Sequence, residues 1–132
     1  MRIEHLFLYG TLMPSQPAWP VVASVAVEHH PDEVRAVLWD TGHGYPALEL
    51  RDGPAVPGTV VRLAGDGLER TLGRLDDYEG LGPDRYRRSE VTTVGGLRCW
   101  TYEWVGSLRG FREVAGGWTG WVASGSASSR NP

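Results

Sequence analysis

Residues 7–14, with the sequence FLYGTLMP, decide how this chain begins to fold, because an apolar run ends there in a glycine turn. Residues 3–9 are almost continuously apolar, which predicts a strand that is buried on both faces. The turn that follows, residues 9–12, contains no strong acid, strong base or metal ligand. What it offers is a series of backbone N–H groups, and successive N–H groups in a turn form concavities that bind anions.

Short apolar runs bounded by turn residues predict further strands along the chain, at residues 21–29, 34–39, 47–50 and 58–63. Residues 41–46, TGHGYP, supply the glycines and the proline of a turn. Two longer runs are expected to form a β-hairpin around the Gly95-Gly96 pair, namely residues 86–94 and 97–105. From Gly106 onward we expect an irregular chain.

One segment, residues 66–80, has the pattern of an amphipathic helix. Asp66 is the expected N-cap, and Glu69 stands at the capping-box spacing from it. Gly80 is expected to end the helix in a left-handed conformation. Three leucines share one face of this helix: Leu68, Leu72 and Leu75.

Six or seven strands and one good helix predict an α+β fold, a small mixed or antiparallel β-barrel with one main helix packed outside. The length of 132 residues fits a single domain, which we place at residues 1–122. Residues 123–132 are rich in serine and are expected to be a disordered tail.

Composition excludes several classes of function. The net charge of −3 gives no electrostatic footprint for nucleic acid or an anionic membrane. No apolar segment approaches the roughly 20 residues that span a bilayer.

Cys99 is the only cysteine, so no intramolecular disulfide forms and a cytoplasmic location is expected. The four histidines lack metal-ligand spacing and no G-x-S-x-G motif occurs, so we expect no metal, no other cofactor and no enzyme nucleophile.

The remaining candidates for chemistry are the acids of LDDYEG, residues 75–80, at the end of the expected helix. Acids are unfavourable there because the helix dipole is negative at its C-terminus. With burial, the same placement raises a carboxyl pKa toward the range that suits proton transfer. We expect Asp76 and Asp77 to point outward and Glu79 to turn inward.

These pieces, taken in order, resemble the γ-glutamylcyclotransferase-like superfamily. The resemblance is carried by YGTL after the first strand, GYPAL, LDDYEG at a helix end, YRR just after it, and GGW near the end, and it spans roughly residues 3–118. It is nearest to the small AIG2-like, γ-glutamylamine cyclotransferase and BtrG-like branch. The resemblance implies a small β-barrel with a cavity at one mouth.

The resemblance also implies an activity, the cyclisation of a γ-glutamyl amine to 5-oxoproline with release of the free amine. The substrate's own α-amine attacks its own γ-carbonyl, so the enzyme needs a base, a positioned substrate and donors for negative charge. Glu79 matches the family's glutamate, and its substrate-holding loop matches Tyr9, Gly10, Thr11 and Leu12. Two further tyrosines are expected to act as donors to substrate at the cavity mouth: Tyr86 and Tyr102.

Three readings follow from this resemblance. The first is a cyclotransferase with Glu79 as general acid and base, acting on γ-glutamyl-ε-lysine, another γ-glutamyl amine or an acylated biosynthetic intermediate. The second is a non-catalytic module of the same fold that binds a small molecule. The third is an amidohydrolase in which Glu79 activates water. The expected partner is a small γ-glutamyl molecule, and the sequence indicates no oligomeric state.

Overall fold

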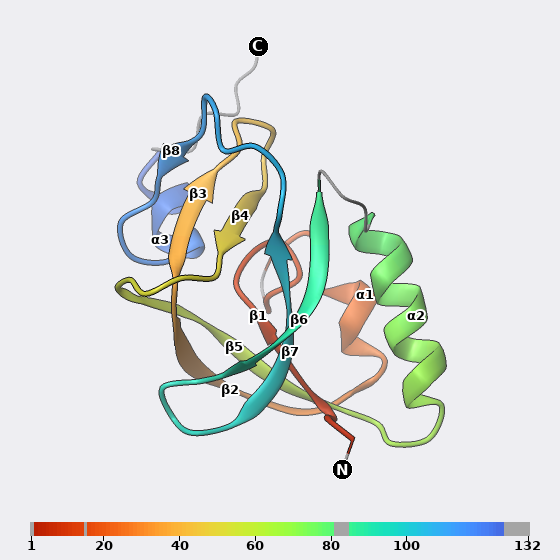
Figure 1. The fold of residues 1–132 in the computed structure, drawn as a ribbon. Coiled ribbons are helices and arrows are strands. Elements are labelled where there is room, and N and C mark those ends of the chain that lie inside the picture. Colours follow the sequence, from red (N-terminus) through yellow and green to blue (C-terminus); the bar gives the residue numbers. More distant parts are fainter. Residues whose placement is uncertain (1, 15, 81–84, 126–132) are drawn as a thin grey trace.

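The structure is a computed structural model that describes residues 2–14, 16–80 and 85–125. Its strands form a five-stranded sheet in the order β2-β5-β1-β7-β6 and a three-stranded sheet in the order β4-β3-β8 (Figure 1). The strands are β1 His5–Leu8, β2 Ala26–Arg35, β3 Val37–Asp40, β4 Pro46–Glu49, β5 Ala55–Leu63, β6 Tyr86–Thr92, β7 Arg98–Trp104 and β8 Arg112–Glu113. The helices are α1 Pro20–Ala23, α2 Leu68–Glu79 and α3 Trp118–Ala123.

The first strand occupies the centre of the larger sheet, as its apolar sequence predicts. β1 pairs antiparallel with β5 and parallel with β7. Its last three residues, Leu6, Phe7 and Leu8, are buried on both faces of the sheet. Because β1 ends inside the core, the turn that follows it starts from a fixed position between β5 and β7.

Helix α2 confirms the expected leucine face, since Leu68, Leu72 and Leu75 are all buried. Figure 1 shows the helix outside the larger sheet, along one side of it. Its first helical residue is Leu68, and the cap position is held by Gly67 in a left-handed conformation, so Asp66 is not the N-cap. At the other end Gly80 has φ 72°, as predicted, and its N–H donates to the carbonyl of Asp76 at 3.1 Å.

The predicted hairpin is present as β6 and β7, which pair antiparallel from Tyr86 opposite Trp104 to Thr92 opposite Arg98. Gly96 takes the positive φ, 93°, that the connecting turn requires. The hairpin joins the larger sheet through β7, which lies beside β1. It therefore brings Tyr86 and Tyr102 close to the end of β1.

Further sequence expectations about secondary structure are wrong. The expected strand at residues 34–39 is divided, because β2 ends at Arg35 and β3 begins at Val37. Residues 21–29 are not one strand: α1 occupies Pro20–Ala23, and β2 begins at Ala26 and continues to Arg35. A short apolar run does not distinguish a helix from a strand, and a proline is well suited to the first turn of a helix. The chain after Gly106 is not irregular, because it forms β8 and α3.

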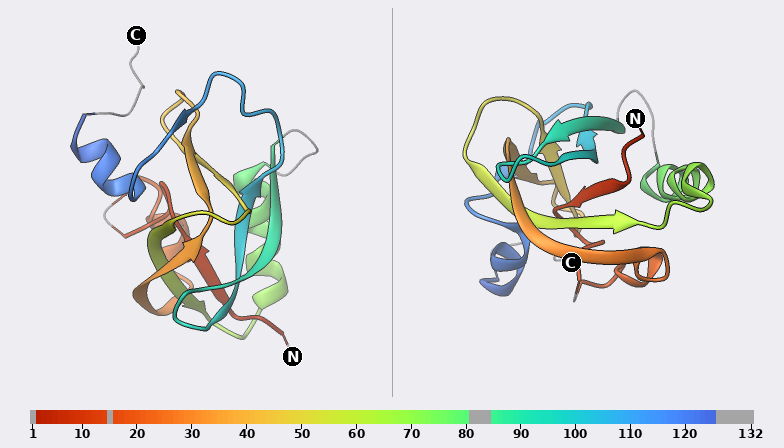
Figure 2. Two further views of the ribbon diagram at one scale, coloured as in Figure 1. Left: turned by 60° about the vertical axis from the view of Figure 1, so that its left-hand side comes forward. Right: turned by 90° about the horizontal axis from the view of Figure 1, so that it is seen from below.

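The expected α+β class is confirmed, but the sheets do not form a single closed barrel within the described residues. The long strands β2 and β5 curve strongly (Figure 2), and the second sheet, β4-β3-β8, is separate from the first. The core is nevertheless continuous between them, because Leu38 and Leu48 of the second sheet belong to the same buried cluster as β1. Of the expected tail, residues 126–132 lie outside the described residues, while α3 extends to Ala123.

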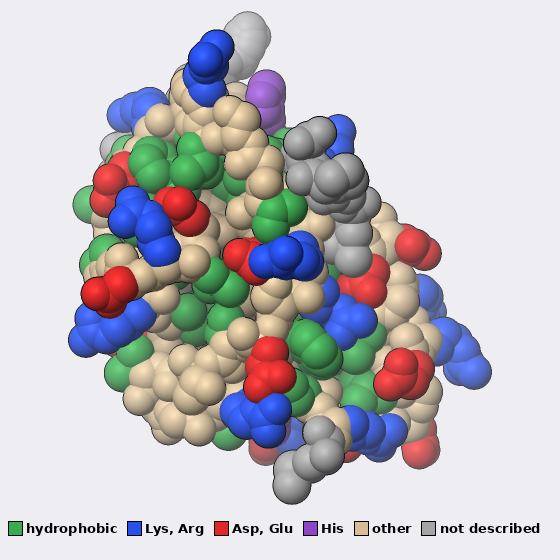
Figure 3. All heavy atoms as spheres, in the orientation of Figure 1, with side chains coloured by type: hydrophobic (Ala, Val, Ile, Leu, Met, Phe, Trp, Pro, Cys, Tyr) green, Lys and Arg blue, Asp and Glu red, His purple; other side chains and the backbone are tan. Residues whose placement is uncertain are grey.

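The described surface gives no single-signed patch on the face seen in Figure 3, where acidic and basic side chains are interspersed. None of the helices in this part of the chain has the length and apolar character needed to cross a membrane.

Candidate active site

A cavity of about 390 Å³ opens where β1, α2 and the start of β6 meet. All seven residues singled out by the sequence line it: Tyr9, Gly10, Thr11, Leu12, Glu79, Tyr86 and Tyr102. They come from four places in the chain, the turn after β1, the end of α2, the start of β6 and the second half of β7. The structure thus brings together an acid and a glycine turn that are about 70 residues apart in the sequence.

Glu79 is the last residue of α2, and its carboxyl group faces the cavity. Burial raises the pKa of this carboxyl from 4.5 to about 7. No described side chain forms an ion pair or a hydrogen bond with it. An acid with a pKa near 7 is partly ionised at neutral pH, so it can both accept and return a proton.

The turn at residues 9–12 is closed by a hydrogen bond from the Met13 N–H to the Gly10 carbonyl at 3.1 Å. The Thr11 carbonyl accepts a second bond from the Ala18 N–H at 2.9 Å. The N–H groups of Gly10, Thr11 and Leu12 donate to no described residue, so they remain available to an anion. The carbonyls of Gly10 and Thr11 are thus engaged by the protein, while the N–H groups of residues 10–12 have no described acceptor.

Gly10 is required for close packing. It does not have a positive φ. A Cβ at this position would lie 2.8 Å from Cγ and 2.9 Å from Cδ of Pro46. Pro46, the proline of the turn sequence at residues 41–46, therefore lies directly against the glycine turn and also lines the cavity.

Three tyrosines of the cavity form hydrogen bonds to the protein through their hydroxyl groups. The Tyr9 hydroxyl donates to the Tyr102 carbonyl, which ties the glycine turn to β7. The Tyr86 hydroxyl donates to the Pro46 carbonyl at 2.6 Å, and the Tyr102 hydroxyl donates to Oδ1 of Asp76 at 2.7 Å. Tyr86 and Tyr102 were expected to donate to substrate, but the structure commits their protons to groups of the protein.

Burial is the main reason why the pKa values of Tyr9, Tyr86 and Tyr102 are raised, so these phenols stay protonated. The negative charge of Glu79 contributes to the increase at each of them. This contribution shows that the three phenols lie in the electrostatic neighbourhood of the Glu79 carboxyl.

Asp76 does not point outward, contrary to the sequence expectation. It accepts the Tyr102 hydroxyl and also pairs with Arg88, whose Nε lies 2.8 Å from Oδ1 and whose Nη2 lies 3.2 Å from Oδ2. Arg88 in turn lies 4.5 Å from the ring centre of Trp100 on β7. Asp76 stands three residues before Glu79 on α2, so the same helix face carries both carboxyl groups. That spacing was the signal in the sequence that could have identified Asp76.

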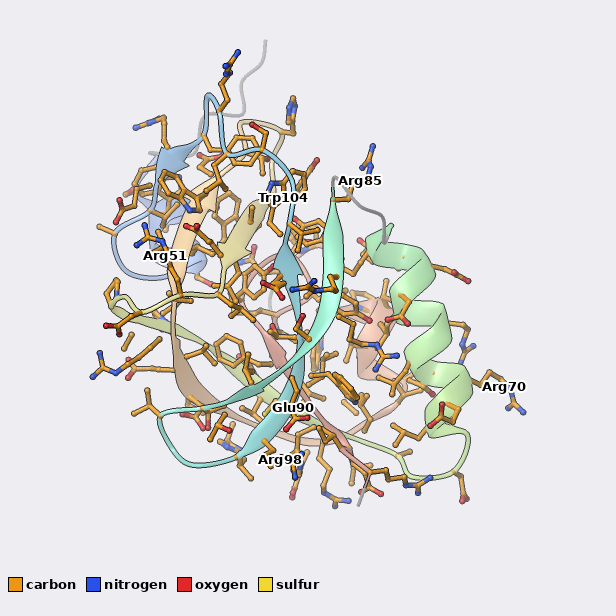
Figure 4. All side chains as sticks on the ribbon, viewed as in Figure 1. Arg51, Arg70, Arg85, Glu90, Arg98 and Trp104 are labelled. Atoms are coloured by element: carbon orange, nitrogen blue, oxygen red, sulfur yellow. The ribbon has the colours of Figure 1, made fainter. Side chains whose placement is uncertain are left out.

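Sequence reasoning also missed several residues of the cavity wall. Tyr45, Tyr78 and Arg85 line it together with Phe7 and Leu8. Arg85, which directly precedes β6, and Trp104, the last residue of β7, lie at the same end of the hairpin (Figure 4), and Arg85 lines the cavity. No local motif distinguishes these positions from ordinary surface or core residues.

Other candidate chemistry is absent from the described residues. Within the residues that the structure describes, no group of three or more histidine, cysteine or carboxylate side chains is placed to hold a metal ion. Cys99 is fully buried, and burial raises the pKa of its thiol to about 12, so the thiolate is not accessible as a nucleophile.

An α+β fold whose cavity combines one carboxyl of raised pKa with a glycine turn of free amides is suited to proton transfer and anion binding. Comparison with known families makes this specific: residues 6–120 match the family described as gamma-glutamyl cyclotransferase, AIG2-like. The chain belongs to this family.

Individual relatives agree with this assignment. A gamma-L-glutamyl-butirosin B gamma-glutamyl cyclotransferase from Niallia circulans is 30% identical over 105 residues, which cover 76% of this chain and 66% of that protein, just under two thirds of its length. An AIG2-like protein from Mus musculus is similar in structure, with a TM-score of 0.64 and 25% identity over 78% of each chain. YkqA from Bacillus subtilis shares the fold at a TM-score of 0.70 and 20% identity, covering 99% of this chain and 44% of its own.

Proposed function

We propose that this protein is a γ-glutamyl cyclotransferase that converts a γ-glutamyl amine to 5-oxoproline and the free amine. The observation that carries the proposal is the placement of Glu79, with a pKa of about 7, in one cavity with the unpaired N–H groups of residues 10–12. The match to the gamma-glutamyl cyclotransferase, AIG2-like family supports it independently.

In the proposed reaction the nucleophile belongs to the substrate. The Glu79 carboxylate removes a proton from the α-ammonium group, and the α-nitrogen forms a bond to the γ-carbonyl carbon. The tetrahedral intermediate then collapses, the bond from the γ-carbon to the leaving nitrogen breaks, and Glu79 returns the proton to that nitrogen. The ring nitrogen loses its second proton as it becomes an amide nitrogen, and the released amine takes up this proton as an ammonium ion. One carboxyl group with a pKa near neutrality can perform both transfers in sequence.

The glycine turn holds the substrate in the conformation that closes the ring. Its free N–H groups bind the α-carboxylate of the glutamyl arm, because turn amides form anion-binding concavities. Fixing that carboxylate restricts the arm and brings the α-nitrogen and the γ-carbon together, which provides most of the rate gain of an intramolecular reaction.

Three chemical classes are candidates for the substrate whose amine is released. The relative from Niallia circulans carries the name of a γ-glutamyl-butirosin B enzyme, which makes an acylated biosynthetic intermediate one candidate class. γ-Glutamyl-ε-lysine and simple γ-glutamyl amines are the others.

The test is to incubate the purified protein with a panel of these three classes and to follow the products by mass spectrometry. We expect 5-oxoproline and the free amine from at least one member, and we expect Glu79→Gln to abolish the product while the protein remains folded. Free glutamate in place of 5-oxoproline would indicate an amidohydrolase. Binding without any turnover would indicate a non-catalytic module, and product formation by Glu79→Gln would contradict the proposed role of this residue.

A further inference from the structure

The two tyrosines of the β6-β7 hairpin, Tyr86 and Tyr102, can only accept hydrogen bonds from a ligand in the cavity. A phenol has one proton, and both Tyr86 and Tyr102 give theirs to groups that can only accept, the Pro46 carbonyl and the Asp76 carboxylate. Arg88 donates to both oxygens of Asp76, which holds this carboxylate in place as the acceptor for Tyr102. Each phenol oxygen can therefore present only lone pairs to the cavity.

Tyr9 differs from these two tyrosines. Its proton goes to the Tyr102 carbonyl, and its oxygen also accepts a hydrogen bond from the Leu48 N–H. The Tyr9 hydroxyl thus already donates and accepts within the protein and is not available to a ligand in the same way. Its role is to tie the glycine turn to β7.

The third acceptor in this part of the cavity is Glu79. Its carboxyl group has no donor among the described residues, although it is partly buried. Leaving a partly buried acceptor without a partner costs free energy, so a ligand that supplies donors is favoured at this place. The opposite arrangement, in which Tyr86 or Tyr102 donates to a ligand oxygen, would leave the Pro46 carbonyl or the Asp76 carboxylate without its hydrogen bond.

We propose that the phenol oxygens of Tyr86 and Tyr102 and the ionised carboxylate of Glu79 form a subsite of hydrogen-bond acceptors for the α-ammonium group of the substrate. An ammonium group carries three donors and a positive charge, and the subsite supplies three acceptors, of which the Glu79 carboxylate also carries a negative charge. This inference deepens the proposed function and rests on it for the identity of the ligand. It assigns the tyrosines the role of recognising a primary ammonium beside a carboxylate that is bound at the glycine turn.

The inference can be tested without turnover by comparing two probes, L-glutamate and glutarate. They share both carboxyl groups and differ only in the α-ammonium group. Isothermal titration calorimetry on the full chain is expected to show that the wild-type protein binds L-glutamate at least tenfold more tightly than glutarate. Each of Tyr86→Phe and Tyr102→Phe is expected to reduce that preference severalfold, because a hydrogen bond to a charged group is lost.

Tyr78→Phe is the matched control, since Tyr78 also lines the cavity but is half exposed and belongs to α2. This variant is expected to keep the wild-type preference. The ratio of the affinities for L-glutamate and glutarate distinguishes a loss of ammonium recognition from a general distortion of the cavity. A distorted cavity is expected to weaken the binding of both probes together. The Tyr86 variant remains informative if Tyr102→Phe also disturbs Asp76.

Equal binding of L-glutamate and glutarate by the wild-type protein would overturn the inference, as would a preference that both phenylalanine variants retain or a folded protein that binds neither probe. The outcome is independent of the cyclisation assay. A tyrosine-dependent preference for L-glutamate in a protein that forms no 5-oxoproline would preserve the subsite and reject the proposed function.

Discussion

At the scale of single residues, Glu79 illustrates a conflict between stability and chemistry. Burial raises its pKa from 4.5 to about 7, so the folded state binds the proton more tightly than the unfolded chain does. The associated stability is fully present below about pH 4.5 and is lost as the pH rises through 7. Ionising Glu79 in the folded protein therefore costs on the order of 3 kcal/mol.

Replacement of Glu79 by glutamine is expected to remove this cost together with the activity. At pH 8 the free energy of unfolding of Glu79→Gln should exceed that of the wild type by up to about 3 kcal/mol, and the difference should shrink toward zero near pH 4.5. Urea denaturation at the two pH values measures it. Identical pH dependence of the two proteins would show that the carboxyl is not desolvated.

Gly10 is a second residue whose role can be isolated. Gly10→Ala places a Cβ within 3 Å of the Pro46 ring, which is too rigid to move aside easily, so the turn must shift away from the cavity. We expect kcat/KM for the identified γ-glutamyl amine to fall by about tenfold or more, because the substrate is misplaced.

Gly73→Ala on α2 is the control for this prediction. Its Cβ would meet nothing within 4 Å, and the substitution should stabilise the helix by up to about 1 kcal/mol with unchanged activity. Unchanged kcat/KM in Gly10→Ala would refute the role of the turn.

At the scale of elements, the position of Glu79 depends on how the end of α2 is attached to the larger sheet. Three leucines bury one side of the helix, and the partly buried cluster of Asp76, Arg88 and Tyr102 joins its last turns to the β6-β7 hairpin. Because Asp76 is one helical turn before Glu79, any loosening of this attachment moves the carboxyl relative to the glycine turn.

Arg88→Ala is therefore expected to lower both stability and turnover. It removes a bidentate pair and leaves Asp76 with one partner fewer, for an expected loss of about 1–3 kcal/mol in urea denaturation. Arg98→Ala on the same hairpin is the matched control, since Arg98 pairs with Glu90 in an exposed position at the other end of the sheet (Figure 4). An exposed pair contributes about 0–1 kcal/mol, so the control should behave almost as the wild type. Equal losses in the two variants would contradict a specific attachment through Arg88.

At the scale of the whole molecule, the two sheets share one core, and α3 covers part of it. Trp118 is 1% exposed and belongs to the main buried cluster, and the Trp121 Nε1 donates to Oδ2 of Asp40 on β3 at 2.8 Å. A segment that looks irregular in the sequence thus closes the core from the side of the second sheet.

Trp118→Ala is expected to destabilise the protein by about 3–5 kcal/mol, because it leaves a large cavity in a closely packed core. Val122→Ala on the same helix is the control, since Val122 is exposed, and its effect should remain within about 0.5 kcal/mol. Thermal unfolding distinguishes the two. A Trp118 variant with the stability of the wild type would show that α3 is not part of the core.

Several features of this protein were predictable from sequence because local patterns encode them. The apolar run of β1, the leucine face of α2, the left-handed Gly80 and the hairpin around Gly96 each depend on neighbours a few residues away. Seven of the residues around the cavity were also predictable from the sequence, through its resemblance to a family whose motifs occur in this order.

Tertiary structure decided what depends on distant neighbours. The short run after Pro20 becomes a helix before it becomes a strand, and the segment after Gly106 acquires structure by packing on β3 and the core. Asp76 turns inward because Arg88 and Tyr102 are there to receive it.

The sequence by itself was sufficient to predict which residues supply the acid, the glycine turn and the two phenols of the cavity. Only the tertiary structure decided the protonation of Glu79 and the direction in which Tyr86 and Tyr102 donate. The reason is physical: a pKa is set by burial, and the direction of a hydrogen bond is set by its partner. For Tyr86 that partner, Pro46, lies 40 positions away along the chain.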